Sequence, residues 1–266
     1  MPGFWGADSL TPLNFPTNGT TLADYVINVQ YGGSPHDQIV WWGRYFDYGP
    51  NQAQHWTGQA EAQALHNAVG AYANPTSGQA WVLPIASPYN PYNINGDYSA
   101  GANAGAYASG VIAQNVNSGI YLPGSGQLYV YLDIENSAPT NVNFLDGWAS
   151  AVNGYQIGSS SPLYASAYIN GQNSAQVSLL ENAGVYFQAW GSEPEPICSG
   201  CYSPGPPWGV APAGTIPTNV WQYGEMNSSC SSCRGGQTLY ADLDQTNPSV
   251  QGSSGYGMCD NMLYIP

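Results

Sequence analysis

The sequence predicts a single α/β domain built as a TIM-like barrel of the (β/α)5β3 type. Its 266 residues are close to the roughly 250 that such a barrel needs. Short β-rich runs alternate with amphipathic helical patterns over the first two-thirds of the chain, which is typical of strands joined by helices. In the last third the helical patterns stop, and long loops rich in Pro, Gly and Cys follow the sixth and seventh strands. We expect one domain over residues 1–266, with an open doubly wound sheet as the alternative fold.

Eight short runs rich in β-branched and aromatic residues, bounded by turn residues, are the predicted strands. They cover residues 4–8, 39–46, 81–86, 128–135, 163–168, 185–190, 220–223 and 239–243. Helix-linked strands lie parallel to one another, so their carboxyl ends are expected to meet at one mouth of the barrel.

Five segments between the strands repeat apolar residues at the i, i+3, i+4 and i+7 spacing of a helix that buries one face. The four clearer stripes are Leu22, Tyr25, Val26 and Val29; Leu65, Ala68, Val69 and Tyr72; Ala104, Tyr107, Ala108, Val111 and Ile112; and Leu145, Trp148, Ala149 and Val152. A fifth, weaker pattern covers residues 173–183 and ends before Gly184. The loops at 192–215 and 226–237 then separate three closing strands that are expected to have no helix.

The charge balance excludes several classes of partner. The chain has 16 acidic residues and two basic ones, Arg44 and Arg234, which give a net charge of −14. Nucleic acid and anionic membranes are excluded, because binding phosphate requires clustered cations. No apolar run reaches the roughly 20 residues of a membrane span, so we expect no membrane insertion.

The rest of the composition favours a secreted, extracellular protein. Only 7% of the residues are charged, so the surface is expected to consist of Asn, Gln, Ser, Thr, Tyr and Gly. Such a surface changes little with pH and suits an acidic extracellular setting. The start at Met1, with no positively charged leader, is expected for a mature chain.

The fourth predicted strand carries two carboxylates at its carboxyl end, Asp133 and Glu135. Side chains alternate along a strand, so Val130, Leu132 and Ile134 are expected to face the helices and both acids to face the barrel interior. Residues two apart on a strand lie about 6.5–7 Å apart, which places two carboxylates around one scissile bond. Glycoside hydrolysis uses such a pair, because one carboxyl protonates the leaving oxygen and the other stabilises positive charge at the sugar carbon. The alternative is that both acids are solvated loop residues.

Two more acids, Asp8 at the end of the first strand and Asp242 in the last, are expected at the same mouth. Together with Asp133 and Glu135 they form the predicted catalytic set. No metal site or cofactor is expected with them, because the three histidines of the chain are scattered.

Substrate binding is expected to involve aromatic residues at strand ends and in the loops that follow, since sugar rings stack on aromatic faces. The candidates are Tyr89, Tyr168, Trp190, Trp221 and Tyr223. Arg44, within the aromatic run at residues 41–46, is the remaining candidate. A buried arginine needs a carboxylate partner, because an unpaired buried charge costs several kcal/mol. Two interpretations are open for Arg44: a structural ion pair, or a contact that orients Asp8 or Asp133.

The cysteines form two Cys-x-x-Cys pairs and one single residue. Cys198 and Cys201 are separated by 28 residues from Cys230 and Cys233, and Cys259 leaves an odd count. In a secreted protein this pattern favours disulfides, whereas in a cytosolic one it would indicate a four-cysteine zinc site. Both interpretations stay open.

Several motifs resemble glycoside hydrolase family 25, the lysozymes that cleave peptidoglycan. They are Phe4-Trp5-Gly6-Ala7-Asp8, Leu132-Asp133-Ile134-Glu135, Tyr164-Ala165-Ser166-Ala167-Tyr168, Trp221-Gln222-Tyr223 and Ala241-Asp242-Leu243. Gly43-Arg44-Tyr45-Phe46 is more similar to the related glycoside-hydrolase-like barrels, a domain of unknown function. The resemblance implies a barrel of eight strands and five helices. It also implies that Glu135 is the general acid/base, that Asp133 assists at the substrate, and that Asp8 and Asp242 support them.

Two functions follow as hypotheses. The first is a secreted glycoside hydrolase that cleaves an extracellular polysaccharide or a peptidoglycan-like glycan. The near absence of cations suits a neutral glycan better than polyanionic peptidoglycan, which this surface would repel. The second is a catalytically silent glycan-binding or cell-surface structural protein on the same barrel. The carboxylate pair favours the enzyme, and the polar surface and odd cysteine favour the second hypothesis.

Overall fold

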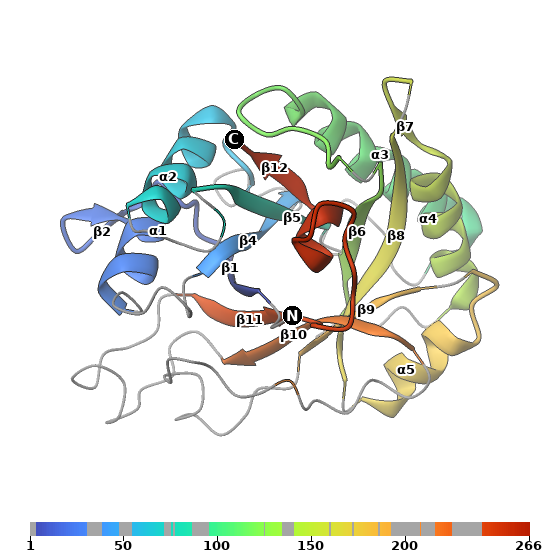
Figure 1. Cartoon of the computed structure of the whole chain (residues 1–266). Coiled ribbons are helices and arrows are strands. Elements are labelled where there is room, and N and C mark those ends of the chain that lie inside the picture. The colour runs from blue at the N-terminus through green and yellow to red at the C-terminus, as the bar shows by residue number, and fades with distance from the viewer. Residues whose placement is uncertain are drawn as a thin grey trace.

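The computed structural model describes residues 4–30, 39–47, 55–71, 76, 78–86, 96–124, 126–134, 141–159, 161–171, 173–185, 187–192, 208, 216–224 and 241–266. Within these ranges the fold is mixed α/β, with a closed eight-stranded barrel and five α-helices. The helices lie around the outside of the barrel (Figure 1). The predicted barrel is therefore confirmed, and the open doubly wound sheet is wrong.

The barrel closes because each of its eight strands pairs with two others. Their order is β5 (Ala80–Ala86), β4 (Ile39–Asp47), β1 (Trp5–Ser9), β11 (Asp242–Thr246), β10 (Thr218–Gly224), β9 (Ala189–Ser192), β8 (Ser161–Asn170) and β6 (Leu128–Asp133). Pairing of Ile85 with Tyr131 joins β6 back to β5.

Strand direction changes only at β11 among these eight. The pairs from β1 through β4, β5, β6, β8 and β9 to β10 are parallel, whereas β11 is antiparallel to both β1 and β10. An antiparallel strand can start at the mouth where the preceding strand ends, so it needs no crossover helix. Asp242 therefore lies at the same mouth as the carboxyl ends of the parallel strands, although it begins its own strand.

Four shorter strands lie outside the barrel path. β2 (Pro16–Thr17) and β3 (Thr20–Thr21) form a hairpin whose turn residues Asn18 and Gly19 both have positive φ, as such two-residue turns require. β7 (Gln156–Ile157) pairs with the start of β8. β12 (Leu263–Ile265) pairs antiparallel with the first half of β5. The sequence did not predict β12, because a three-residue strand has too short a pattern to be recognised without its partner.

Strand positions were predicted to within a few residues, with two larger differences. β9 begins at Ala189 rather than at residue 185, and β11 (Asp242–Thr246) continues past its predicted end at residue 243. Residues 239 and 240 of the predicted strand lie outside the described residues. Of the predicted loops at 192–215 and 226–237, only Ser192 and Trp208 lie within the described residues.

The helices agree with the predicted positions. They are α1 (Leu22–Asp24), which continues as the π-helix η1 (Tyr25–Gln30), α2 (Gln59–Gly70), α3 (Tyr98–Asn115), α4 (Val142–Gly154) and α5 (Ser174–Glu181); a short 3-10 helix, η4 (Gly257–Asn261), precedes β12. Side chains cap four of them: Thr21, Asp97, Asn141 and Asn173 each accept a hydrogen bond from a backbone N–H of the first turn. The whole predicted stripe of α4 is buried.

The stripe of α3 differs from its prediction. Tyr107 is 49% exposed, and the buried face instead carries Gly101, Ala104, Gly105, Ala108 and Ile112. Small residues are needed there because α4 lies directly against α3. A Cβ atom on Gly101 would overlap the carbonyl oxygen of Phe144, and one on Gly147 of α4 would overlap that of Tyr98. Glycine thus sets the distance between the two helices.

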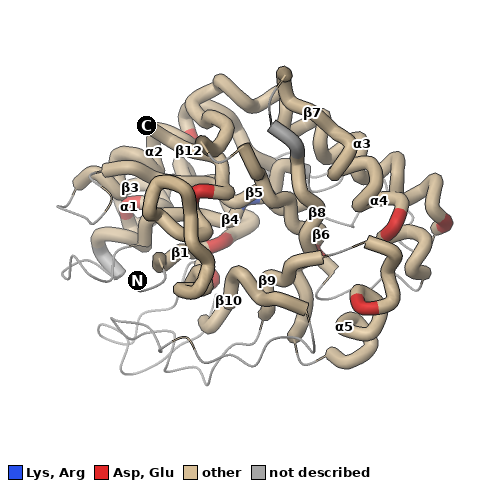
Figure 2. The backbone as a smooth tube through the Cα atoms, turned by 45° about the vertical axis from the view of Figure 1, so that its right-hand side comes forward, with Lys and Arg blue, Asp and Glu red and all other residues tan. Residues whose placement is uncertain are grey.

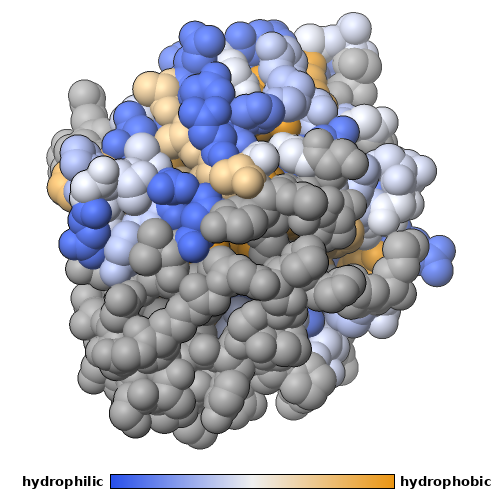
Figure 3. Space-filling view, turned by 60° about the vertical axis from the view of Figure 1, so that its left-hand side comes forward, coloured by the Kyte–Doolittle hydropathy of each residue, from blue (hydrophilic) through white to orange (hydrophobic). Residues whose placement is uncertain are grey.

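Figures 2 and 3 show the charge and hydropathy of the described residues from two sides. Figure 2 shows the acidic positions scattered over several elements rather than gathered on one face. Figure 3 shows a mainly hydrophilic described surface on one side of the molecule, with small apolar areas. No helix among the described residues is long and apolar enough to cross a membrane.

We predict opposite effects for two Gly-to-Ala changes in α3. Gly101→Ala should destabilise the protein by about 1–3 kcal/mol, because the added methyl overpacks the contact with α4. Gly110→Ala should stabilise it by about 0.5–1 kcal/mol, because that position has space for a methyl group and alanine favours the helix. Urea unfolding measures both. Equal effects would show that the glycine contact does not limit helix packing.

Candidate active site

The carboxyl ends of the parallel strands surround a set of polar side chains that point into the barrel. Strand register places them, because paired residues of neighbouring strands point to the same side. Asp8 of β1 pairs with Asp242 of β11, and Asp133 of β6 pairs with Tyr168 of β8. Asp8 is 3% exposed and Asp133 is 4% exposed. The structure therefore brings Asp8, Asp133 and Asp242 to one mouth of the barrel.

A hydrogen bond from Tyr45 of β4 holds Asp133 in place. The Tyr45 hydroxyl donates a hydrogen bond of 2.8 Å to Asp133 Oδ2. Strand β5 lies between β4 and β6, so this contact spans one strand inside the barrel. A hydrogen bond donated to a carboxylate favours its ionised form.

Asp8 is held by Gln222 of β10. Gln222 Nε2 donates to Asp8 Oδ2 at 3.2 Å and to the Tyr168 hydroxyl oxygen at 2.6 Å. The Ser192 hydroxyl of β9 donates to Gln222 Oε1 at 2.7 Å. The amide therefore connects side chains of β1, β8 and β9, all of which are buried.

Beneath these groups Trp190 of β9 fills the barrel. Its ring stacks on Tyr168 with centroids 4.6 Å apart and meets the rings of Tyr131 and Trp41 edge-on. Its Nε1 donates to Asp244 Oδ1 at 3.0 Å. Gly43 makes room for the indole, since a Cβ there would overlap it.

This position corrects the expectation for Trp190. Its side chain is 0% exposed, so it has no open face on which a sugar could stack. Its place at the end of a predicted strand does not by itself distinguish an exposed platform from a core residue.

Tyr131 belongs to the same layer of buried aromatic side chains beneath the carboxylates. Burial raises the pKa of its phenol well above the ordinary value; the neighbouring Tyr129 adds to the rise, and the Ser166 hydroxyl opposes it. Tyr131 therefore stays neutral at physiological pH.

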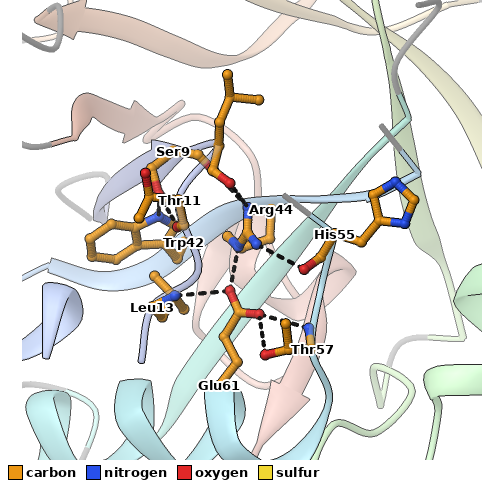
Figure 4. Close-up of polar contacts among 9 residues, drawn as sticks. Ser9, Thr11, Leu13, Trp42, Arg44, His55, Thr57 and Glu61 are labelled. Carbon is orange, nitrogen blue, oxygen red and sulfur yellow. Dashed lines mark hydrogen bonds and ion pairs between the residues drawn. The ribbon is translucent and has the colours of Figure 1, made fainter. Parts of the chain in front are cut away.

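Arg44 lies on the other face of β4 (Figure 4). Its Nε forms a buried ion pair with Glu61 of α2, and both side chains are 0% exposed. Its remaining nitrogens donate to the carbonyl oxygens of Ser9 at 2.7 Å, Leu10 at 3.2 Å and His55 at 3.3 Å. The expected carboxylate partner is present, and it is Glu61 rather than Asp8 or Asp133. Arg44 is thus a structural residue, because alternation along β4 turns it away from the interior that Tyr45 faces.

Glu61 completes this buried cluster. It accepts hydrogen bonds from the backbone N–H of Leu13 at 3.0 Å and from the N–H and hydroxyl of Thr57 at 2.8 and 3.1 Å. The cluster therefore ties the segment after β1, the start of α2 and β4 together.

Trp221 and Tyr223 also differ from their predicted place. Gln222 points into the barrel, so its two neighbours point outward. Trp221 packs edge-on against Trp208, and Tyr223 against Trp5. Both are buried, at 1% and 3% exposure. They form an aromatic cluster on the outer side of the barrel and do not face the carboxylates.

Other predicted residues lie outside the described residues: Glu135, Tyr89 and the four cysteines of the two Cys-x-x-Cys pairs. Cys259 has a free, buried thiol. Within the described ranges, no group of three or more His, Cys, Asp or Glu side chains could hold a metal ion.

Sequence reasoning missed Ser192 and Gln222 as parts of the site. Strand alternation was the signal that could have identified Gln222, which is a polar residue between two aromatic ones in a predicted strand.

Comparisons with known proteins identify the fold alone. No family model matches the chain, and no curated protein matches it. A crystal structure at 1.07 Å of an uncharacterized B. stearothermophilus protein is similar, with a TM-score of 0.60 and 19% sequence identity. The alignment covers 92% of this chain and 97% of that one. The likeness supports the fold.

We predict that Glu61→Gln destabilises the protein by about 3–5 kcal/mol, because Arg44 would keep its charge in a buried place without its partner. The matched control is Glu181→Gln, the same change at an exposed position of α5, which should alter stability by less than about 0.5 kcal/mol. The measurement is chemical denaturation followed by circular dichroism. Similar small effects of both changes would contradict a structural ion pair.

Cys259 should resist alkylation in the folded protein. Burial, and secondarily the charge of Asp260, raise the pKa of its thiol well above the ordinary value, so the reactive thiolate is scarce at mildly alkaline pH. Iodoacetamide treatment and peptide mapping should find Cys259 unmodified in native protein and modified in denaturant. Rapid modification of the native protein would contradict this. The same mapping without reductant tests the predicted disulfides. Alkylation of the other four cysteines would exclude disulfides between them.

Proposed function

We propose that this protein is an extracellular glycoside hydrolase on a (β/α)5β3 barrel. The observation that carries the proposal is the meeting of Asp8, Asp133 and Asp242 at one mouth of a closed barrel. Barrel enzymes carry their chemistry at the carboxyl ends of their strands, and hydrolysis of a glycosidic bond needs carboxyl groups in two different protonation states.

The proposed mechanism divides the work between Glu135 and Asp133. Glu135, two residues beyond Asp133 in the chain, donates a proton to the glycosidic oxygen. Asp133, whose ionised form the Tyr45 hydroxyl favours, stabilises the positive charge that develops at the sugar carbon. Asp8 and Asp242 support this pair by their charge at the same mouth.

The proposed substrate is a neutral or weakly charged polysaccharide. The side chains that donate hydrogen bonds to the carboxylates are neutral, a phenol, an amide and an indole, and the cation Arg44 lies on the other face of β4. A net charge of −14 would repel a polyanionic glycan at neutral pH, so muramic-acid-rich peptidoglycan is the less suitable member of the class.

A second candidate function, a silent glycan-binding or cell-surface structural protein, has one observation in its favour. Asp8 and Asp133 are nearly fully buried, and Trp190 fills the space beneath them. A barrel without catalytic function would also have buried carboxylates above a packed aromatic core.

The test is a hydrolysis screen over a panel of neutral and acidic glycans between about pH 3 and pH 7, read by mass spectrometry. We expect turnover with an acidic optimum, because the general acid loses its proton as the pH rises. Glu135→Gln should reduce the rate by about 10²–10⁴-fold, and Asp133→Asn should also reduce it strongly. The control Glu181→Gln should keep wild-type turnover.

Each outcome separates the two functions. Near-wild-type turnover of Glu135→Gln on a substrate with a poor leaving group would remove Glu135 as the acid. Binding of a glycan by calorimetry without hydrolysis at any pH would favour the silent binding protein.

A further inference from the structure

Gln222 occupies a special place among the polar residues of the barrel. It is 3% exposed and lies on β10, which is not adjacent to β1 or β8 in the strand order. Its amide nevertheless reaches Asp8 of β1 and Tyr168 of β8 by hydrogen bonds of 3.2 and 2.6 Å.

The hydrogen-bond partners determine which way the amide points. An ionised carboxylate is an acceptor only, so the atom of Gln222 that faces Asp8 must be the nitrogen. The oxygen then faces Ser192, whose hydroxyl donates to it at 2.7 Å. With the amide reversed, its oxygen would face an oxygen of Asp8, which requires a protonated Asp8.

The same orientation assigns a proton at Tyr168. Its hydroxyl oxygen accepts from Gln222 Nε2, so the phenolic proton is directed to another acceptor. Asp133 is the register partner of Tyr168 on β6. Gln222 thus donates hydrogen bonds both to Asp8 and to Tyr168, which is paired with Asp133.

We propose that Gln222 is a positioning residue of the carboxylate site, which holds Asp8 in its ionised form and directs the phenolic proton of Tyr168 away from the amide. The inference rests on the proposed function only for its effect on turnover. Its effect on Asp8 is a property of the folded protein, whether or not the site is catalytic.

The groups that face Asp8 show why such a donor is needed. Asp242 lies opposite it on β11, Asp244 lies further into the barrel on the same strand, and Asp133 lies at the same mouth. Like charges raise the pKa of a carboxyl, and a hydrogen bond to the charged form lowers it. Tyr45 and Tyr168 face the same interior, whereas Arg44 lies on the opposite face of β4. Loss of the Gln222 donor should therefore favour a protonated Asp8.

The experiment is a pH titration of the Asp8 carboxyl by carbon NMR on protein labelled at aspartate, with Asp8→Asn to assign the signal. Gln222→Met keeps the size of the side chain and removes the amide. We expect the Asp8 midpoint to rise by about one pH unit in this variant. The matched control is Gln245→Met, the same change at a buried glutamine of the neighbouring strand whose side chain faces the outside of the barrel. It should leave the Asp8 midpoint unchanged.

An unchanged or lowered Asp8 midpoint in Gln222→Met, or an equal rise in Gln245→Met, would overturn the proposal. Should Gln222→Met not fold, Gln222→Asn replaces it, because the shorter amide cannot span both partners and should shift Asp8 in the same direction. If a glycan substrate is found, Gln222→Met should lower kcat more than it changes KM and should move the acidic limb of the pH profile upward. Absence of turnover in wild type would contradict the proposed function. The Asp8 titration would still test whether Gln222 keeps Asp8 ionised.

Discussion

The buried ion pair between Arg44 and Glu61 is the interaction on which the positions of the site strands depend. It joins β4 to α2 and, through the carbonyl oxygens of Ser9 and Leu10, fixes the chain where it leaves β1. Asp8 directly precedes Ser9, and Tyr45 directly follows Arg44. A displacement of this cluster would move both a carboxylate of the site and the hydroxyl that holds Asp133.

The cluster also shows how the chain separates opposite charges across one sheet. Burying a cation and a carboxylate is costly unless their hydrogen bonds are satisfied, and here backbone carbonyls and N–H groups satisfy both. Inside the barrel, Asp133 and Asp8 instead accept hydrogen bonds from Tyr45 and Gln222, which are neutral. Alternation along β4 thus keeps the Arg44 guanidinium away from the acids of the barrel interior.

The barrel could be predicted from the sequence because its periodic patterns are local. The stripe of α4 and the run of β6 each contain enough residues to define a period, and the carboxyl-end positions of Asp8 and Asp133 follow from strand direction. What failed depends on contacts between distant segments. The partner of Arg44 lies 17 residues away on a helix, and the burial of Trp190 depends on Gly43 of another strand. The exposed Tyr107 was assigned to a buried stripe because the glycines that bring α3 against α4 carry no hydrophobic signal.

The floor of aromatic rings has a consequence for the chemistry at the mouth. Trp190, Tyr168 and Trp41 pack where the small residues Gly6 and Gly43 leave space. They exclude water from beneath the carboxylates, and electrostatic interactions are stronger where water is excluded. A hydrogen bond from a neutral donor then shifts the protonation of a carboxyl more than it would in solvent. Asp133 accepts such a bond from Tyr45, and Asp8 accepts one from Gln222. The orientation of two neutral groups, a phenol and an amide, therefore influences which carboxyls at this mouth are ionised.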